Sequence, residues 1–152
     1  MHLGFSFTGL IVFLLPMIIN IFYVIFPPKR SGEEVQNKRF PVLEIIENVT
    51  RIAYAIILCL WISNEKLNYK SYLLIVSIIF LILYYMVWIR YFIGGRNVKL
   101  LGKSFLFIPM PLAIFPVLYF IFASLWMSNY IATGIMIIFG IVHSIISYKN
   151  LY

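Results

Sequence analysis

Polar and charged side chains interrupt the apolar stretches of this chain at few places, and these side chains could carry chemistry. Glu44, Glu47, Asn48 and Arg51 fall within an arc of about 100° on one helix. Glu47 and Arg51 are four residues apart, in the order that favours a helical ion pair. An unpaired charge at the centre of a bilayer costs at least roughly 2.5–3.5 kcal/mol, so we expect a structural pair. The alternative is a carboxylate that exchanges protons or holds a cationic substrate.

The last apolar stretch carries a second set of polar residues, which share one face. Within an arc of about 120° lie Ala132, Thr133, Met136, Gly140, His143, Ser144 and Ser147. Small and hydroxyl-bearing residues let helices approach closely in a bilayer. We therefore expect His143 to face other helices, either as an interhelical hydrogen-bond donor or as a proton-relay group.

The composition indicates that membrane helices position these residues. Hydrophobic residues make up 63% of the 152 residues, charged residues 11%, and the mean hydropathy is +0.99. Soluble domains are about 45–50% apolar and about 25% charged. Five apolar stretches, each near the roughly 20 residues that cross a bilayer, predict one all-α transmembrane domain over residues 1–152. The expected helices are Leu3–Phe26, Pro41–Ser63, Ser71–Ile93, Ser104–Met127 and Ile131–Tyr148.

The distribution of basic residues predicts how this bundle is oriented. With five crossings, one side holds Lys29, Arg30, Lys38, Arg39, Arg51, Arg90, Arg96, Lys99, Lys103 and Lys149. Only Lys66 and Lys70 lie on the other side. By the positive-inside rule the N-terminus is outside and the C-terminus in the cytoplasm of a protein of the inner (plasma) membrane. Four crossings would place loops 27–40 and 94–103 on opposite faces and lose this asymmetry.

Depth and orientation together predict a polar pocket that faces the cytoplasm. The polar residues concentrate in the cytoplasmic half of the bundle, and the outer half has almost none. We expect Arg90 either to extend to phosphate headgroups or to clamp an anion at the mouth of the pocket. The candidate pocket residues are Asn20, Glu44, Glu47, Asn48, Arg51, Arg90, His143 and Ser147.

Three prolines, Pro109, Pro111 and Pro116, predict a kinked or broken fourth helix at the same depth. Each proline removes a backbone donor and frees a carbonyl oxygen. Irregular backbone survives inside a membrane only where protein or a wet cavity satisfies it. The break therefore agrees with a pocket.

The third helix ends in an aromatic group that we expect to lie at the membrane interface. Tyr84, Tyr85, Trp88 and Tyr91 surround Arg90 there. Aromatic residues beside a basic residue are typical of the belt where a helix leaves the hydrocarbon.

Several classes of function are excluded or disfavoured. The chain has no aspartate, one cysteine and two histidines, so we expect no metal site and no cofactor. It has no Walker loop, nucleophile elbow or HExxH sequence, and no catalytic residues are predicted. The net charge of +7 is explained by basic loops beside anionic lipid of the inner leaflet, not by nucleic-acid binding.

Four short segments carry a family resemblance: Phe7-Thr8-Gly9-Leu10, Glu47-Asn48-Val49-Thr50-Arg51-Ile52, Trp88-Ile89-Arg90-Tyr91-Phe92 and Ile108-Pro109-Met110-Pro111-Leu112. In them, and over nearly its whole length, the chain resembles a group of small five-helix integral membrane proteins of bacteria. The resemblance implies a bacterial membrane protein and no particular activity. Members of that group carry a second histidine one turn after the first in the last helix, where this chain has Ser147.

The expected function is that of a non-enzymatic membrane component. It would be an accessory subunit or a protein that binds lipid or a protein partner, including a second copy of itself. The alternative is a small transporter that uses the intramembrane glutamate, arginine and histidine. A lipid-modifying enzyme is a third reading.

Overall fold

The computed structural model describes residues 1–29 and 39–151, and this part of the chain is all-α apart from two short strands. Arg30 and Lys38 lie outside the described residues. Each predicted stretch corresponds to one long helix, and the last helix extends beyond the predicted Ile131–Tyr148 at both ends. The elements are β1 (His2–Leu3), α1 (Phe7–Ile25), α2 (Pro41–Leu60), β2 (Trp61–Ile62), α3 (Tyr72–Ile93), α4 (Lys99–Gly102), α5 (Pro111–Trp126) and α6 (Tyr130–Leu151).

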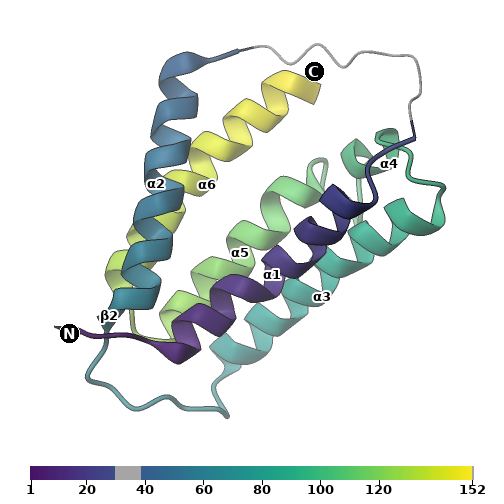
Figure 1. The fold of residues 1–152 in the computed structure, drawn as a ribbon. Coiled ribbons are helices and arrows are strands. Elements are labelled where there is room, and N and C mark those ends of the chain that lie inside the picture. The colour runs from purple at the N-terminus through teal and green to yellow at the C-terminus, as the bar shows by residue number, and fades with distance from the viewer. Residues whose placement is uncertain (30–38, 152) are drawn as a thin grey trace.

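The five long helices alternate in direction and form two groups (Figure 1). Helices α1, α3 and α5 lie side by side, and α2 packs against α6. Helix α5 also contacts α6 and so joins the groups. The groups meet closely near β2 and diverge toward the end that carries the C-terminus.

The structure suggests a membrane protein. Three helices, α1, α3 and α6, are long and apolar enough to cross a bilayer. Their outward faces expose large aliphatic side chains, such as Ile21, Ile82 and Ile138. A surface of this kind is stable in hydrocarbon and unfavourable in water.

The first helix begins four residues later than expected, at Phe7 instead of Leu3. Ser6 caps it, because the Ser6 hydroxyl accepts a hydrogen bond from the Gly9 amide at 2.9 Å. The preceding residues pair with the end of α2, where the amides of Gly4 and Ser6 donate to the carbonyls of Leu60 and Cys59. The last carbonyls of a helix lack helical donors, so the N-terminal segment satisfies them. The second helix accordingly ends at Leu60 and not at Ser63.

The expected start of the fourth helix at Ser104 is wrong, and the helix runs as one element from Pro111 to Trp126. Helix α5 begins at Pro111, which occupies the first helical position, and Pro109 lies before it. Phe105 and Ile108 instead form an isolated antiparallel bridge. A residue that precedes proline is disfavoured in helical conformation, which explains why the helix cannot extend back through this segment. Pro116 lies inside α5.

The aromatic group at the end of α3 is not an interfacial belt, and that expectation is wrong. Tyr84, Trp88 and Tyr91 are buried, the last with 0% exposure. They pack with Tyr23 of α1 in tilted and edge-to-face pairs whose ring centroids are 5.2–6.3 Å apart. These rings fill the space between α1 and α3.

The inward face predicted for α6 is correct. Ala132, Thr133, Met136 and Gly140 are buried, and His143 is half-buried. A Cβ atom at Gly140 would lie 2.5 Å from a Val117 methyl carbon, so the small residue permits the close approach of α5 and α6.

Tyrosine hydroxyls satisfy backbone carbonyls between helices. Pro16 lies inside α1 and has no amide hydrogen, which leaves the Val12 carbonyl without its helical donor. The Tyr119 hydroxyl of α5 donates to that carbonyl at 2.8 Å. Tyr54 of α2 donates in the same way to the Phe120 carbonyl at 3.1 Å. These bonds tie α5 to α1 in its own group and to α2 in the other.

We predict that Tyr119→Phe lowers stability in a way that depends on Pro16. Loss of the hydroxyl leaves the buried Val12 carbonyl unsatisfied, which costs about 1–3 kcal/mol. In a Pro16→Ala background the restored amide at position 16 donates to Val12, so Tyr119→Phe should cost much less. Thermal melts in mild detergent measure both effects.

Tyr72→Phe is the matched control, because Tyr72 is 72% exposed. It should leave the melting temperature unchanged. An equal loss from Tyr119→Phe in both backgrounds would contradict the assigned bond.

Candidate functional site

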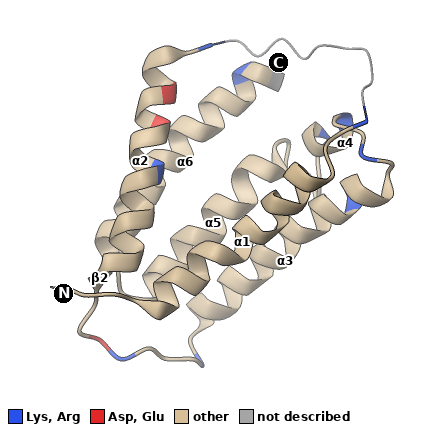
Figure 2. Cartoon of the chain, viewed as in Figure 1, with Lys and Arg blue, Asp and Glu red and all other residues tan. Residues whose placement is uncertain are grey.

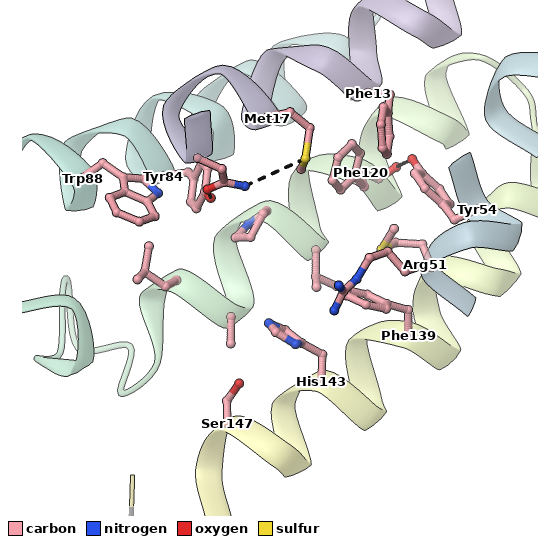
Figure 3. Close-up of a pocket in the computed structure, with 16 residues that line it drawn as sticks. Phe13, Met17, Arg51, Tyr54, Tyr84, Trp88, Phe120, Phe139, His143 and Ser147 are labelled. Carbon is pink, nitrogen blue, oxygen red and sulfur yellow. Dashed lines mark hydrogen bonds between the residues drawn. The ribbon is translucent and has the colours of Figure 1, made fainter. Parts of the chain in front are cut away.

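A cavity of about 450 Å³ lies between the two helix groups (Figure 3). All five long helices contribute to its wall. The lining residues are Phe13, Met17, Asn20, Arg51, Tyr54, Tyr84, Trp88, Leu112, Ala113, Pro116, Val117, Phe120, Met136, Phe139, His143 and Ser147. The volume is within the range of about 300–1,000 Å³ that is usual for small-molecule sites.

The two ends of this cavity differ in chemistry. Phe13 and Phe120 lie close together and make one end apolar (Figure 3). Met136, two turns before His143 on α6, adds to the apolar wall. His143 and Ser147 lie in the last three turns of α6, toward the C-terminal end of the bundle. The cavity is therefore amphipathic along the direction in which the helices run.

Glu47 does not itself line the cavity, but it joins two residues of the polar end, Arg51 and His143. One carboxylate oxygen, Oε1, accepts a hydrogen bond from Arg51 Nη2 at 2.9 Å and lies 2.7 Å from His143 Nδ1. The Glu47 side chain is 11% exposed, that of His143 28% and that of Arg51 55%. The predicted pair of Glu47 and Arg51 is thus present, and it extends across 96 residues of sequence to α6. We call these three residues the charge cluster.

The contact with Glu47 orients the imidazole of His143. A carboxylate can only accept, so His143 Nδ1 carries the hydrogen and Nε2 is left for other partners. The ring stacks on Phe139 at 5.1 Å between centroids and an interplanar angle of 13°. The Arg51 guanidinium also lies over Phe139, 5.7 Å from the ring centroid. Phe139 therefore supports both the imidazole and the guanidinium on the cavity wall (Figure 3).

A second polar contact closes the cavity on the side of α1 and α3. The Tyr84 hydroxyl donates to Asn20 Oδ1 at 2.8 Å. Asn20 Nδ2 makes a long contact of 3.9 Å with the Met17 sulfur. Beside them, the buried Nε1 of Trp88 has no hydrogen-bond acceptor among the described residues.

Four residues of the predicted pocket do not line the cavity. Glu47 contacts two residues that do, and the other three lie elsewhere. Arg90 holds the segment after α3, because its guanidinium donates to the carbonyls of Leu100, Lys103 and Ser104 at 2.6–3.1 Å. It neither lines the cavity nor points into it, so its proposed role as a clamp at the pocket mouth is not supported. Glu44 accepts from the Phe40 amide at 3.0 Å, at the start of α2. Asn48 is exposed on the outer side of α2.

The inward face of α2 is rotated relative to the sequence expectation. Tyr54 and Leu58 are buried along with Glu47, whereas Asn48 is not. The spacing of residues 47, 51, 54 and 58 is typical of an inward helical stripe, and this signal was available in the sequence. The roles of Tyr84 and Trp88 in the cavity wall were missed, because their aromatic character favoured an interfacial position.

The cluster contains no metal-binding geometry. Within residues 1–29 and 39–151, no three His, Cys, Asp or Glu side chains come together. Cys59 lies at the far end of α2 from His143.

Comparison with protein-family models, with curated proteins and with solved structures finds no match to this chain. An apolar cavity with a cationic group and an imidazole at one end can hold an amphiphile. It lacks a nucleophile hydrogen-bonded to a base among the described residues.

We predict that the charge cluster contributes to stability mainly through compensation of charge. Arg51→Met should lower the melting temperature, because it leaves the nearly buried Glu47 carboxylate without its cation. The loss should be modest, about 1–2 kcal/mol, because Arg51 is half-exposed. The double variant Glu47→Gln, Arg51→Met should recover much of it, since no charge is then left unpaired.

Lys70→Met, which removes an exposed positive charge from the loop before α3, is the control and should have no effect. Thermal melts of the single and double variants in detergent measure the coupling. If the losses of the two single variants simply add in the double variant, the pair does not act as a unit.

Proposed function

We propose that the protein is a five-span, non-catalytic component of the bacterial inner membrane that binds an anionic, single-chain amphiphile. The N-terminus would lie outside and the C-terminus in the cytoplasm. The cavity would open toward the cytoplasmic leaflet. The single observation that carries the binding function is the amphipathic cavity, with the charge cluster at one end.

The arrangement of charge supports this orientation. Basic residues gather at the ends of α1, α3 and α6, at α4 and at the start of α2, which lie at the same end of the bundle (Figure 2). Lys66 and Lys70 lie in the loop at the other end. In a bilayer the more basic end favours the cytoplasm, where anionic headgroups are also found.

Five crossings require α2 and α5 to lie within the membrane. Helix α2 carries Glu44, Glu47 and Arg51, but Glu47 and Arg51 satisfy one another and Glu44 lies in the first turn. Helix α5 has 16 residues, about 24 Å of helix, and is surrounded by α1, α3 and α6. A helix enclosed by other helices can be shorter than the bilayer is thick, because protein and not lipid covers its ends.

We predict that cysteines placed in two loops react from opposite sides of the membrane. In a Cys59→Ala background, Lys66→Cys should react with an impermeant maleimide on intact cells. Lys103→Cys, the matched change at the other end, should react only after the membrane is opened. Both substitutions replace an exposed lysine, so charge is altered equally.

The reverse pattern would contradict the proposed topology. A reporter fused after Tyr152 then separates the two remaining cases. A cytoplasmic reporter indicates that only α1, α3 and α6 cross, and an external one indicates that the whole bundle is inverted.

The chemistry of the cavity supports an anionic amphiphile. Its volume is small for a two-chain glycerolipid but suits one acyl chain. Arg51 and His143 supply hydrogen-bond donors at the end nearer the headgroups. The aromatic and aliphatic wall toward the bundle centre matches a hydrocarbon chain.

A small carrier is the second candidate. It is favoured by the position of the charge cluster at the junction of α2 and α6, the pair that diverges from the other three helices. Charged groups that line a cavity within a membrane commonly mark a pathway for solutes.

We predict saturable binding of a nitroxide-labelled lysophosphatidylglycerol at mildly acidic pH. The probe should quench Trp88, which lines the cavity, in a variant whose other two tryptophans are replaced by phenylalanine. Ser147→Phe should fill the charged end of the cavity and weaken binding at least about tenfold, which corresponds to about 1.4 kcal/mol.

Ile145→Phe is the control, because Ile145 lies on the outer face of the same helix and is 40% exposed. The Ile145→Phe variant should bind the labelled lysolipid with the same affinity as the parent protein. Quenching that does not saturate, or that Ser147→Phe leaves unchanged, would reject the cavity as the binding site.

A further inference from the structure

We propose that the cavity binds a singly charged anion together with one proton, which His143 holds. This inference rests on the proposed function and specifies it further. It states that the headgroup enters as an anion and that the imidazole becomes an imidazolium in the complex. Binding would therefore be coupled to the uptake of a proton.

The geometry of Glu47 is the starting point. Its Oε1 atom contacts both Arg51 and His143, at 2.9 and 2.7 Å, and the carboxylate is nearly buried. One negative charge thus lies between a permanent cation and a group that can become one. Arg51 uses only Nη2 in this contact, so its remaining donors are available to a ligand at the cavity wall.

The balance of charge then determines which protonation state accepts an anion. With a neutral imidazole the charge cluster has no net charge, because Arg51 and Glu47 cancel. A monoanion would then leave one uncompensated negative charge in a low-dielectric region, which is costly. With an imidazolium the cluster has a net charge of +1, and a monoanion brings it to zero. The bound anion therefore favours the protonated form of His143.

Other charged or titratable groups near His143 do not change this balance. Helix α2 contributes Glu47, Arg51 and Tyr54, and the Tyr54 hydroxyl donates to the Phe120 carbonyl. The part of α5 that lines the cavity contributes Leu112, Ala113, Pro116, Val117 and Phe120, none of which titrates. Across the cavity, α3 contributes Tyr84, which donates to Asn20. Phenols remain neutral near neutral pH.

Lys149, six residues after His143 on α6, points to a different neighbour. Its ammonium lies over the Phe40 ring at 4.8 Å, at the start of α2. It is not among the residues that line the cavity. Among the described residues, His143 is thus the single group that can change the net charge of the cavity wall near neutral pH.

The ligand that fits is a lipid with one chain and a headgroup that carries one charge at every pH of interest. A phosphodiester such as that of lysophosphatidylglycerol has this property. Lysophosphatidylcholine carries the same phosphate with a compensating quaternary ammonium, and dimethyl phosphate carries the same charge without a chain. These three compounds separate the contributions of charge and chain.

The experiment measures the affinity of lysophosphatidylglycerol between about pH 5 and about pH 8, where histidine titrates. Affinity should rise as the pH falls, by at most tenfold per pH unit, because one proton is taken up. Titration calorimetry in two buffers of different ionisation enthalpy counts that proton directly. Lysophosphatidylcholine should bind without proton uptake, and dimethyl phosphate should bind far more weakly than the lysolipid.

Two variants should change the affinity in opposite directions, which a purely structural role of the charge cluster would not predict. His143→Gln should bind independently of pH, with the weak affinity of the parent at high pH, because no proton can be added. Glu47→Gln should also bind independently of pH, but with the strong affinity of the parent at low pH, because its cluster has a charge of +1 without a proton. Melting temperatures of each variant establish that it is folded.

The outcomes separate this inference from the proposed function. Saturable binding with no pH dependence and no proton uptake would overturn the inference and leave the cavity as a lipid site. Retained pH dependence in His143→Gln would also overturn it. No saturable binding at any pH would overturn the proposed function itself. Equal affinities for dimethyl phosphate and the lysolipid would reject a lipid as the source of the anion.

Discussion

A polar group that is closed off from water finds its partner within the protein or remains without one, and much of this structure follows from that constraint. The carbonyl of Val12, freed by Pro16, meets the Tyr119 hydroxyl. The carbonyls at the end of α2 meet the amides of Gly4 and Ser6 and the side-chain amide of Asn129, which donates to Ile57 and Trp61. Each such bond also positions one helix against another, because its two partners come from different elements.

Asn129 illustrates how one side chain can serve several elements. It has 1% exposure, and its Oδ1 accepts from the Ala132 amide at the start of α6. Its Nδ2 reaches two carbonyls at the end of α2. The tight turn between α5 and α6 and the end of α2 are thereby held together. The close approach of the two helix groups at this end, and their separation at the other, leaves room for the cavity.

The charge cluster lies where this separation begins. Glu47 and Arg51 lie one turn apart on α2, and His143 contacts Glu47 from α6. A carboxylate that contacts two groups can weaken its contact with one of them when a ligand enters. It keeps its contact with the other group. This property makes a shared carboxylate suitable for binding that is linked to protonation. It distinguishes the cluster from Arg90, whose Nη1 and Nη2 atoms donate to backbone carbonyls of the segment after α3.

The features that the sequence determined by itself are those that depend on composition or on the period of one helix. These are the all-α class, the five apolar stretches, the inward face of α6 and the pairing of Glu47 with Arg51. Spacing along a helix determines which side chains share a face, so such features need no knowledge of the neighbours. The contact of His143 with Glu47, the burial of Tyr84, Trp88 and Tyr91, and the use of Arg90 in a loop were decided by tertiary structure. These side chains are long enough to reach several different partners. Which partner each one contacts depends on how helices distant in sequence are placed relative to one another.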